Sequence, residues 1–128
     1  MLECLILGDS IAVGITQFRS ECQAIAKVGI TSATFIKQNP NIPESNNTII
    51  SLGTNDSTNT QENLIKLRES IKGKVYWILP PRAKQKQRDI VISLASKYND
   101  VAIGTDKLSP DNIHPTTAGY KGLAHATK

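Results

Sequence analysis

Three side chains in the sequence, Ser10, Asp111 and His114, have the types and settings that acyl chemistry requires. Ser10 follows an apolar run at a predicted strand-to-helix turn, where the amides of the following helix favour developing negative charge. Asp111 and His114 lie three residues apart near the other end of the chain, so a local turn can join them. A nucleophilic serine needs a histidine to take its proton and a carboxylate to orient that histidine. The other histidine, His125, has no acidic neighbour and is expected to be a solvated surface residue.

Two other interpretations of the stretch around Ser10 have to be weighed. Gly8 and Gly14 stand one residue too far apart for a phosphate-binding loop, and Ile15 follows where that motif requires lysine. That interpretation is excluded by spacing. The second alternative is that Asp9 or Ser10 simply caps the following helix, as such residues often do. For this stretch alone, capping would be the better interpretation.

Strand-like and helix-like patterns alternate about five times along the chain. The expected strands are residues 2–7, 22–28, 47–52, 75–79 and 101–104. The expected helices are residues 11–18, 30–37, 61–72 with Gly73 as a C-terminal cap, 85–98, and a last one from Pro115 through Leu123. Such alternation predicts a parallel sheet with helices on both faces, and Trp77, inside the fourth apolar run, is expected in the core.

Each candidate functional residue follows one of the predicted strands. In a parallel sheet the turns after the strands open toward the same edge, where open α/β folds place their sites. We therefore expect Ser10, Gly29, Asn55, Asp111 and His114 to meet in one crevice, although they lie far apart in the sequence. Such a crevice would hold the nucleophile, its base and the donors that an oxyanion needs.

The same residues form four blocks in a characteristic order. The chain resembles the SGNH (GDSL-type) hydrolases over its whole length. The matching blocks are Gly8-Asp9-Ser10 with Gly14, then Gly29, then Gly53-Thr54-Asn55-Asp56, and finally Asp111-x-x-His114-Pro115. The second block is the loosest match, because Ser32 stands where many members carry a second glycine.

The resemblance implies a three-layer, flavodoxin-like α/β fold with a five-stranded parallel sheet in the order 2-1-3-4-5. It implies that Ser10 is the nucleophile, that His114 is general base and then acid, and that Asp111 orients His114. The oxyanion would be held by the backbone amides of Ser10 and Gly29 and by the side-chain amide of Asn55. Members of the family use no metal or other cofactor, and none is expected here.

Taken together, the sequence predicts a serine esterase that works through an acyl-enzyme on Ser10. Short connections leave little material for a lid or a deep acyl tunnel, so small acyl groups are expected, with acetyl as first choice, on a small ester or an acylated carbohydrate or cell-wall polymer. Other uses of the same site are thioesterase, lysophospholipase or peptidoglycan-directed activity. A different class of function is a non-catalytic carbohydrate-binding module. Asp9 and Asp56 are expected to stabilise loops by hydrogen bonds.

The length and net charge of the chain limit the number of domains and the kind of binding partner. The chain of 128 residues is long enough for one domain, 1–128, and too short for two ordinary ones. The net charge of +4 is a mild excess without the dense basic tracts of nucleic-acid-binding tails, so no nucleic-acid partner is expected. The basic run 82–88 is either an ordinary solvated surface or a positively charged surface that attracts an anionic polymer to the site.

Cysteine usage and hydropathy bear on location. Cys4 and Cys22 are the only cysteines and lack metal-ligand spacing, so we expect two reduced core thiols and no disulfide. The apolar amino terminus lacks a basic segment and carries Ser10, which argues against a cleaved export signal. No segment approaches the roughly 18 apolar residues that span a membrane. A cytoplasmic location is the default expectation, with delivery outside the cell by another route left open; the sequence predicts no membrane partner and no oligomeric state.

Overall fold

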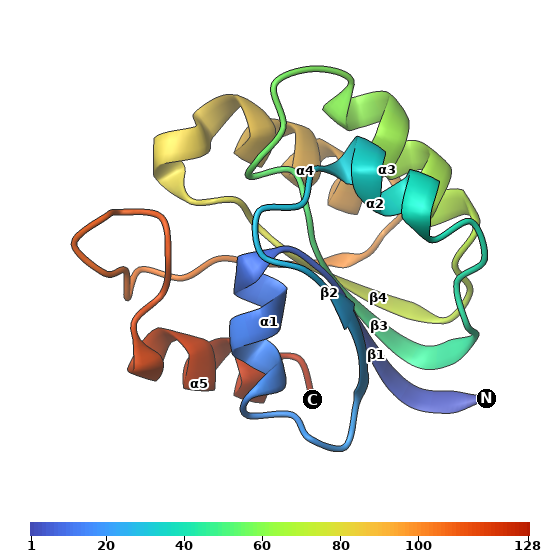
Figure 1. The fold of residues 1–128 in the computed structure, drawn as a ribbon, viewed down its shortest axis with the longest axis horizontal. Coiled ribbons are helices and arrows are strands. Elements are labelled where there is room, and N and C mark those ends of the chain that lie inside the picture. The colour runs from blue at the N-terminus through green and yellow to red at the C-terminus, as the bar shows by residue number, and fades with distance from the viewer.

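Strands and helices alternate along residues 1–128, all of which the computed structural model describes (Figure 1). In chain order the elements are β1 (Leu2–Gly8), α1 (Ser10–Thr16), β2 (Gln23–Ala26), α2 (Ser32–Gln38), β3 (Ser45–Ser51), α3 (Thr60–Glu69), β4 (Lys74–Ile78), the 3₁₀ turn η1 (Arg82–Lys84), α4 (Gln85–Lys97), β5 (Val101–Ile103) and α5 (Thr117–Ala126). None of the helices has both the length and the apolar character needed to cross a bilayer.

The five strands form one parallel sheet in the order β2-β1-β3-β4-β5. Helices α1 and α5 cover one face, and α2, α3 and α4 cover the other (Figure 1). This is the three-layer α/β fold that the sequence predicts. Because all strands run the same way, the turns after β1, β2, β3, β4 and β5 lie at one edge of the sheet.

The core consists of two clusters, one on each face of the sheet. Successive strand side chains point to opposite faces. Leu5 and Leu7 of β1 therefore pack under α2, α3 and α4, whereas Ile6 packs under α1 and α5. Trp77 is fully buried in the first cluster, as predicted, and its indole Nε1–H donates to Asp100 Oδ2 at 2.9 Å. The central strands are thus fixed from both sides.

Two predicted helix ends were wrong. The last helix begins at Thr117, because Thr116 caps it by accepting a hydrogen bond from the Gly119 amide, while Pro115 lies before it in a bridge to Leu108. Helix α3 ends at Glu69, and Gly73 is not its cap. Gly73 has φ +87°, and a Cβ there would lie 2.7 Å from the Ser45 carbonyl oxygen, so glycine is required by close backbone approach.

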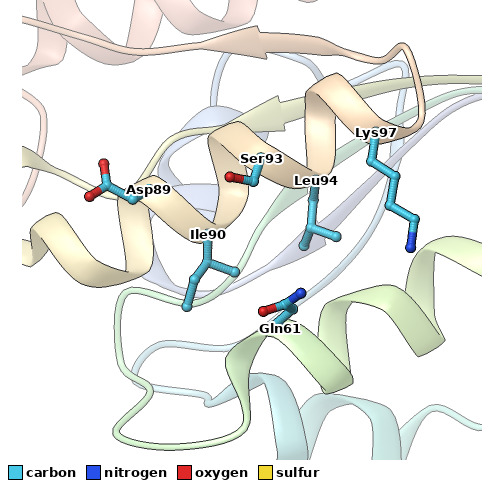
Figure 2. Close-up of a pocket in the computed structure, with 6 residues that line it drawn as sticks. All are labelled: Gln61, Asp89, Ile90, Ser93, Leu94 and Lys97. Atoms are coloured by element: carbon cyan, nitrogen blue, oxygen red, sulfur yellow. The ribbon is translucent and has the colours of Figure 1, made fainter.

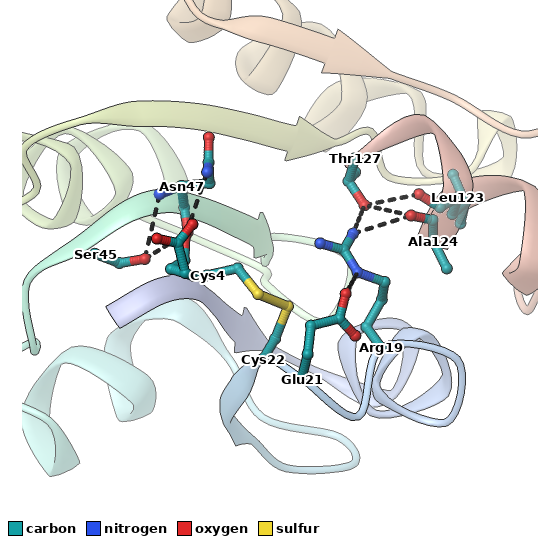
Figure 3. Close-up of a disulfide and its surroundings, with 10 residues drawn as sticks. Cys4, Arg19, Glu21, Cys22, Ser45, Asn47, Leu123, Ala124 and Thr127 are labelled. Carbon is teal, nitrogen blue, oxygen red and sulfur yellow. Dashed lines mark hydrogen bonds and ion pairs between the residues drawn. A yellow bond between two sulfur atoms is a disulfide. The ribbon is translucent and has the colours of Figure 1, made fainter. Parts of the chain in front are cut away.

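The prediction of two reduced thiols is also wrong, because Cys4 and Cys22 form a disulfide (Figure 3). Leu5 pairs with Gln23 in the parallel register, so the preceding residues lie side by side, with 4.8 Å between their Cα atoms. The bond ties β1 to the start of β2 and closes the loop that contains α1. Spacing along the chain could not reveal this pairing, since it depends on how β2 returns beside β1.

Candidate active site

The turn from β1 into α1 presents Ser10 at the carboxyl edge of the sheet. Gly8, which ends β1, has φ +146°, and a Cβ there would lie 1.9 Å from the Ser51 carbonyl oxygen. Only glycine fits such a close approach between β1 and β3. The glycine therefore sets the sharp turn that makes Ser10 the first residue of α1.

Asp9 anchors this turn and caps α1. Its Oδ1 accepts hydrogen bonds from the Ile11 amide and from the Ser51 hydroxyl, both at 3.0 Å, while its Oδ2 is buried without a partner. Burial raises the pKa of Asp9 to about 6, against the opposing effect of these hydrogen bonds. The capping role that the sequence left open between two residues belongs to Asp9, which leaves the Ser10 hydroxyl free for another partner.

That partner is His114, which lies 104 residues further along the chain. Ser10 Oγ is 3.0 Å from His114 Nε2, and His114 Nδ1 is 2.7 Å from Asp111 Oδ2. With Nδ1–H donating to the carboxylate, Nε2 is left to accept a hydrogen bond from the serine hydroxyl. The three residues thus form one continuous chain of hydrogen bonds.

Asp111 is held in place by its own backbone neighbours. Its Oδ1 accepts from the amides of Ile113 and His114 at 2.9 and 3.0 Å, in a turn that brings the carboxylate back to the imidazole. The hydrogen bond from the His114 ring, then those from the two amides, lower the pKa of Asp111 to about 2. It is therefore a carboxylate at neutral pH, although nearly half of its side chain is exposed.

The loop that carries these two residues is itself fastened to the fold. The Ser109 amide donates to the His114 carbonyl at 2.7 Å, and the Thr116 amide donates to the Lys107 carbonyl at 2.8 Å. The His114 side chain is 44% exposed, so this part of the site is open to solvent. His125 lies apart from the site, exposed on α5, as the sequence predicts.

The predicted oxyanion donors come from the turns after β2 and β3. Gly29 is exposed and has φ +79°, and a Cβ there would meet nothing within 4 Å. Asn55 is also exposed, and its Nδ2 donates to the Ile30 carbonyl at 3.1 Å. One N–H of the Asn55 amide is thus engaged with the Gly29 loop, which leaves the second N–H for another acceptor.

Tyr120 of α5 is a neighbour of the site that the sequence interpretation missed. Its ring lies against Gly14 so closely that a Cβ on this glycine would lie 2.2 Å from the tyrosine Cε1. Partial burial, followed by the charges of Asp9 and Asp111, raises the pKa of Tyr120. The only indication of this contact in the sequence is Gly14, because a residue without a side chain leaves room for an aromatic ring.

Ser10, Asp111 and His114 line none of the main hollows of the surface. A hollow of about 250 Å³ lies between α3 and α4, but none of the candidate residues lines it (Figure 2). A smaller hollow of about 200 Å³ includes Gly29 and its neighbours Val28 and Thr31.

The basic run 82–88 lies at the same edge of the sheet, in η1 and the first turn of α4. Arg88 donates to the Pro80 carbonyl at 2.9 Å, and exposed Arg82 lies 3.9 Å from Asp106. Lys84 and Lys86 form no ion pair. These two lysines are the charges of the run that remain available to a partner.

Comparisons with known proteins identify the fold. No protein-family model matches the sequence, and no curated protein matches it in sequence. Among solved structures, a "putative acylhydrolase" from Bacteroides fragilis is similar, with a TM-score of 0.71 and 19% identity over 96% of this chain and 83% of that chain. The C-terminal catalytic domain of peptidoglycan O-acetyltransferase A from Streptococcus pneumoniae, with a methylsulfonyl adduct, has a TM-score of 0.57 and 13% identity over 96% of this chain and 86% of that one. At these identities the likeness establishes a common fold: this chain has the α/β fold of both proteins.

Proposed function

We propose that the chain is a serine esterase of the SGNH type that removes small acyl groups through an acyl-enzyme. The observation that carries this proposal is the hydrogen-bonded series Ser10, His114 and Asp111, with distances of 3.0 and 2.7 Å, at the carboxyl edge of a parallel sheet. Similar series of serine, histidine and carboxylate activate the nucleophile in hydrolases of unrelated folds. The likeness to a putative acylhydrolase and an O-acetyltransferase domain supports the same class of chemistry.

In the first half of the reaction, Ser10 Oγ attacks the ester carbonyl carbon while His114 Nε2 takes the hydroxyl proton. The tetrahedral intermediate collapses by breaking the carbon–oxygen bond to the alcohol, and His114 returns the proton to the leaving oxygen. In the second half, His114 takes a proton from water, the hydroxide attacks the acyl carbonyl, and the proton returns to Ser10 Oγ as the acid leaves. Asp111 remains ionised throughout and stabilises the imidazolium that forms twice.

The negative charge on the carbonyl oxygen needs donors that are already in place. In this proposal they are the backbone amides of Ser10 and Gly29 and the second N–H of the Asn55 amide. The Asn55 bond to the Ile30 carbonyl, at 3.1 Å, supports the assignment because it turns the amide toward the Gly29 loop. All three donors follow strands that end at the same edge of the sheet.

The proposed substrate is an acylated carbohydrate or cell-wall polymer, with acetyl as the first choice of acyl group. An open site can act on a short acyl group that projects from a large molecule, because little of the substrate has to enter it. A second candidate is transfer of the acyl group to a sugar hydroxyl in place of water, which the likeness to a peptidoglycan O-acetyltransferase domain favours. Both reactions proceed through the same acyl-enzyme.

The test is hydrolysis of a series of simple esters with increasing acyl length, with and without a sugar acceptor. We expect acetyl esters to be cleaved fastest, and Ser10→Ala and His114→Ala to abolish turnover with similar, non-additive losses. Ser96→Ala is the matched control, because Ser96 is exposed on α4 and its side chain makes no hydrogen bond. Folded Ser10→Ala protein that keeps the wild-type rate would overturn the mechanism, and formation of a new sugar ester would favour transfer.

A further inference from the structure

Asp56 connects the two loops that carry Gly29 and Asn55. Its Oδ1 accepts a hydrogen bond from the Ser32 amide at 2.8 Å, and its Oδ2 accepts from the hydroxyls of Ser32 and Thr60. Ser32 is the first residue of α2, directly after the Gly29 loop, and Asp56 directly follows Asn55. The carboxylate therefore fastens the turn after β2 to the turn after β3.

This connection is buried and fully occupied. Ser32 is 0% exposed and Asp56 is 7% exposed, so solvent competes little for their hydrogen bonds. Asn63 of α3 donates to the Ser32 hydroxyl at 3.2 Å, and Gln87 of α4 donates to the Asp56 carbonyl at 2.8 Å. The position of Asp56 is thus set from three helices, which makes it a rigid reference point for both loops.

The two donor residues themselves are exposed and make few contacts of their own. Nothing packs against the Cα of Gly29 on the side where a Cβ would lie, and Asn55 is exposed. The Gly29 loop has the turn bond from the Ile30 amide to the Lys27 carbonyl, at 3.3 Å, and the bond from Asn55 to the Ile30 carbonyl. Ile30 itself is buried in the core, and the Ser32 to Asp56 connection adds a buried polar link between the two loops that carry the donors.

We propose that Asp56 is a positioning residue, which acts through Ser32 and Asn55 to set the spacing of the two oxyanion donors that lie on different loops. The inference rests on the proposed function, since it assigns Asp56 a share in stabilising the oxyanion of that reaction. Asp56 does not contact the reacting atoms. Its effect arises because a donor that is misplaced by about 1 Å loses much of its value in the transition state.

The main variant is Asp56→Asn, which keeps one acceptor oxygen for the Ser32 amide but replaces Oδ2, the acceptor for the Ser32 and Thr60 hydroxyls, with an NH₂ donor. We expect kcat to fall by about 10- to 100-fold with a much smaller change in KM, because the transition state depends on donor placement more than the bound ester does. Ser32→Ala removes the hydroxyl bond to Asp56 and the acceptor for Asn63 but keeps the bond from the Ser32 amide, so it should lower kcat in the same direction by less. Val75→Ala is the control for lost stability, because Val75 is buried at the opposite end of the sheet; it should keep the wild-type kcat.

A double-mutant cycle with Asn55→Ala separates positioning from general stability. If Asp56 acts through the oxyanion donors, Asp56→Asn should lower kcat several-fold less in the Asn55→Ala background than in the wild type. A full, multiplicative loss in both backgrounds, or an unchanged kcat in folded Asp56→Asn protein, would overturn this inference while leaving the esterase intact. If the folded wild type hydrolyses no ester faster than Ser10→Ala does, the proposed function is overturned, and this inference with it.

Discussion

Replacing Asp9 by asparagine removes a buried titratable group next to Ser10, and its effect on stability should depend on pH. The pKa of Asp9 is raised from 3.8 to about 6 in the folded chain, chiefly by burial. Because the folded state holds this proton more tightly than the unfolded state, protonation of Asp9 stabilises the fold. That stabilisation is complete below about pH 4 and is lost as the pH rises through about 6.

The magnitude follows from the size of the shift. About two pKa units, at about 1.4 kcal/mol each, amount to about 3 kcal/mol between the acidic and the neutral limit. Urea unfolding of the wild type and of Asp9→Asn at several pH values between about 3 and 8 gives the difference in free energy of unfolding at each pH. Asparagine cannot ionise, so this difference should move in favour of the variant as the pH rises.

The variant also carries a fixed cost, because its NH₂ group occupies the place of the unpartnered Oδ2. A constant offset of this kind does not alter the predicted pH dependence. Asp89→Asn is the matched control, since Asp89 is exposed on α4 and bonds only to Gln85. A difference between wild type and Asp9→Asn that is independent of pH would refute the reasoning about the buried carboxyl.

Three further predictions concern other parts of the molecule. Asn55→Ala should lower kcat by about 10² to 10³, which is roughly 3 to 4 kcal/mol of transition-state stabilisation, with little change in KM. Lower thermal stability with an unchanged rate per folded molecule would show that Asn55 does not stabilise the oxyanion. Reduction of the bond between Cys4 and Cys22, which are 18 residues apart, should lower the free energy of unfolding by about 3 kcal/mol, and two free thiols in the untreated protein would contradict the disulfide. Replacing Lys84 and Lys86 by Gln should slow turnover of an anionic polymeric substrate at low salt and leave the rate on a small neutral ester unchanged. Equal rates for wild type and variant on both substrates at every ionic strength would show that the basic run is an ordinary solvated surface.

The fold could be predicted because its determinants are local. Short segments of the sequence are enough to show the apolar run of β1 and the amphipathic patterns of α3 and α4. Because strands and helices alternate strictly, few topologies are possible. The expected site residues could be named because each follows a strand, and parallel strands end at the same edge. The hydrogen-bonded contact of Ser10 with His114 agrees with the expectation that these two residues meet.

What escaped prediction depends on contacts between distant segments. The disulfide requires the register between β1 and β2, which no single segment encodes. The bond from Ser32 to Asp56 joins residues 24 positions apart, and the sequence alone shows Ser32 only as a departure from a glycine pattern. Pro115 was placed in the wrong element because its bridge to Leu108 and the better cap at Thr116 are features of the folded loop.

The central claim is that Ser10 is a nucleophile activated by His114, and covalent labelling tests it most directly. The protein would be treated with a fluorophosphonate, and the modified residue would be located by mass spectrometry. The account predicts one label, on Ser10, that His114→Ala slows severely and Ser96→Ala leaves unchanged. Folded wild-type protein that takes up no label, or takes it up on another residue, would contradict the account and favour a non-catalytic carbohydrate-binding module.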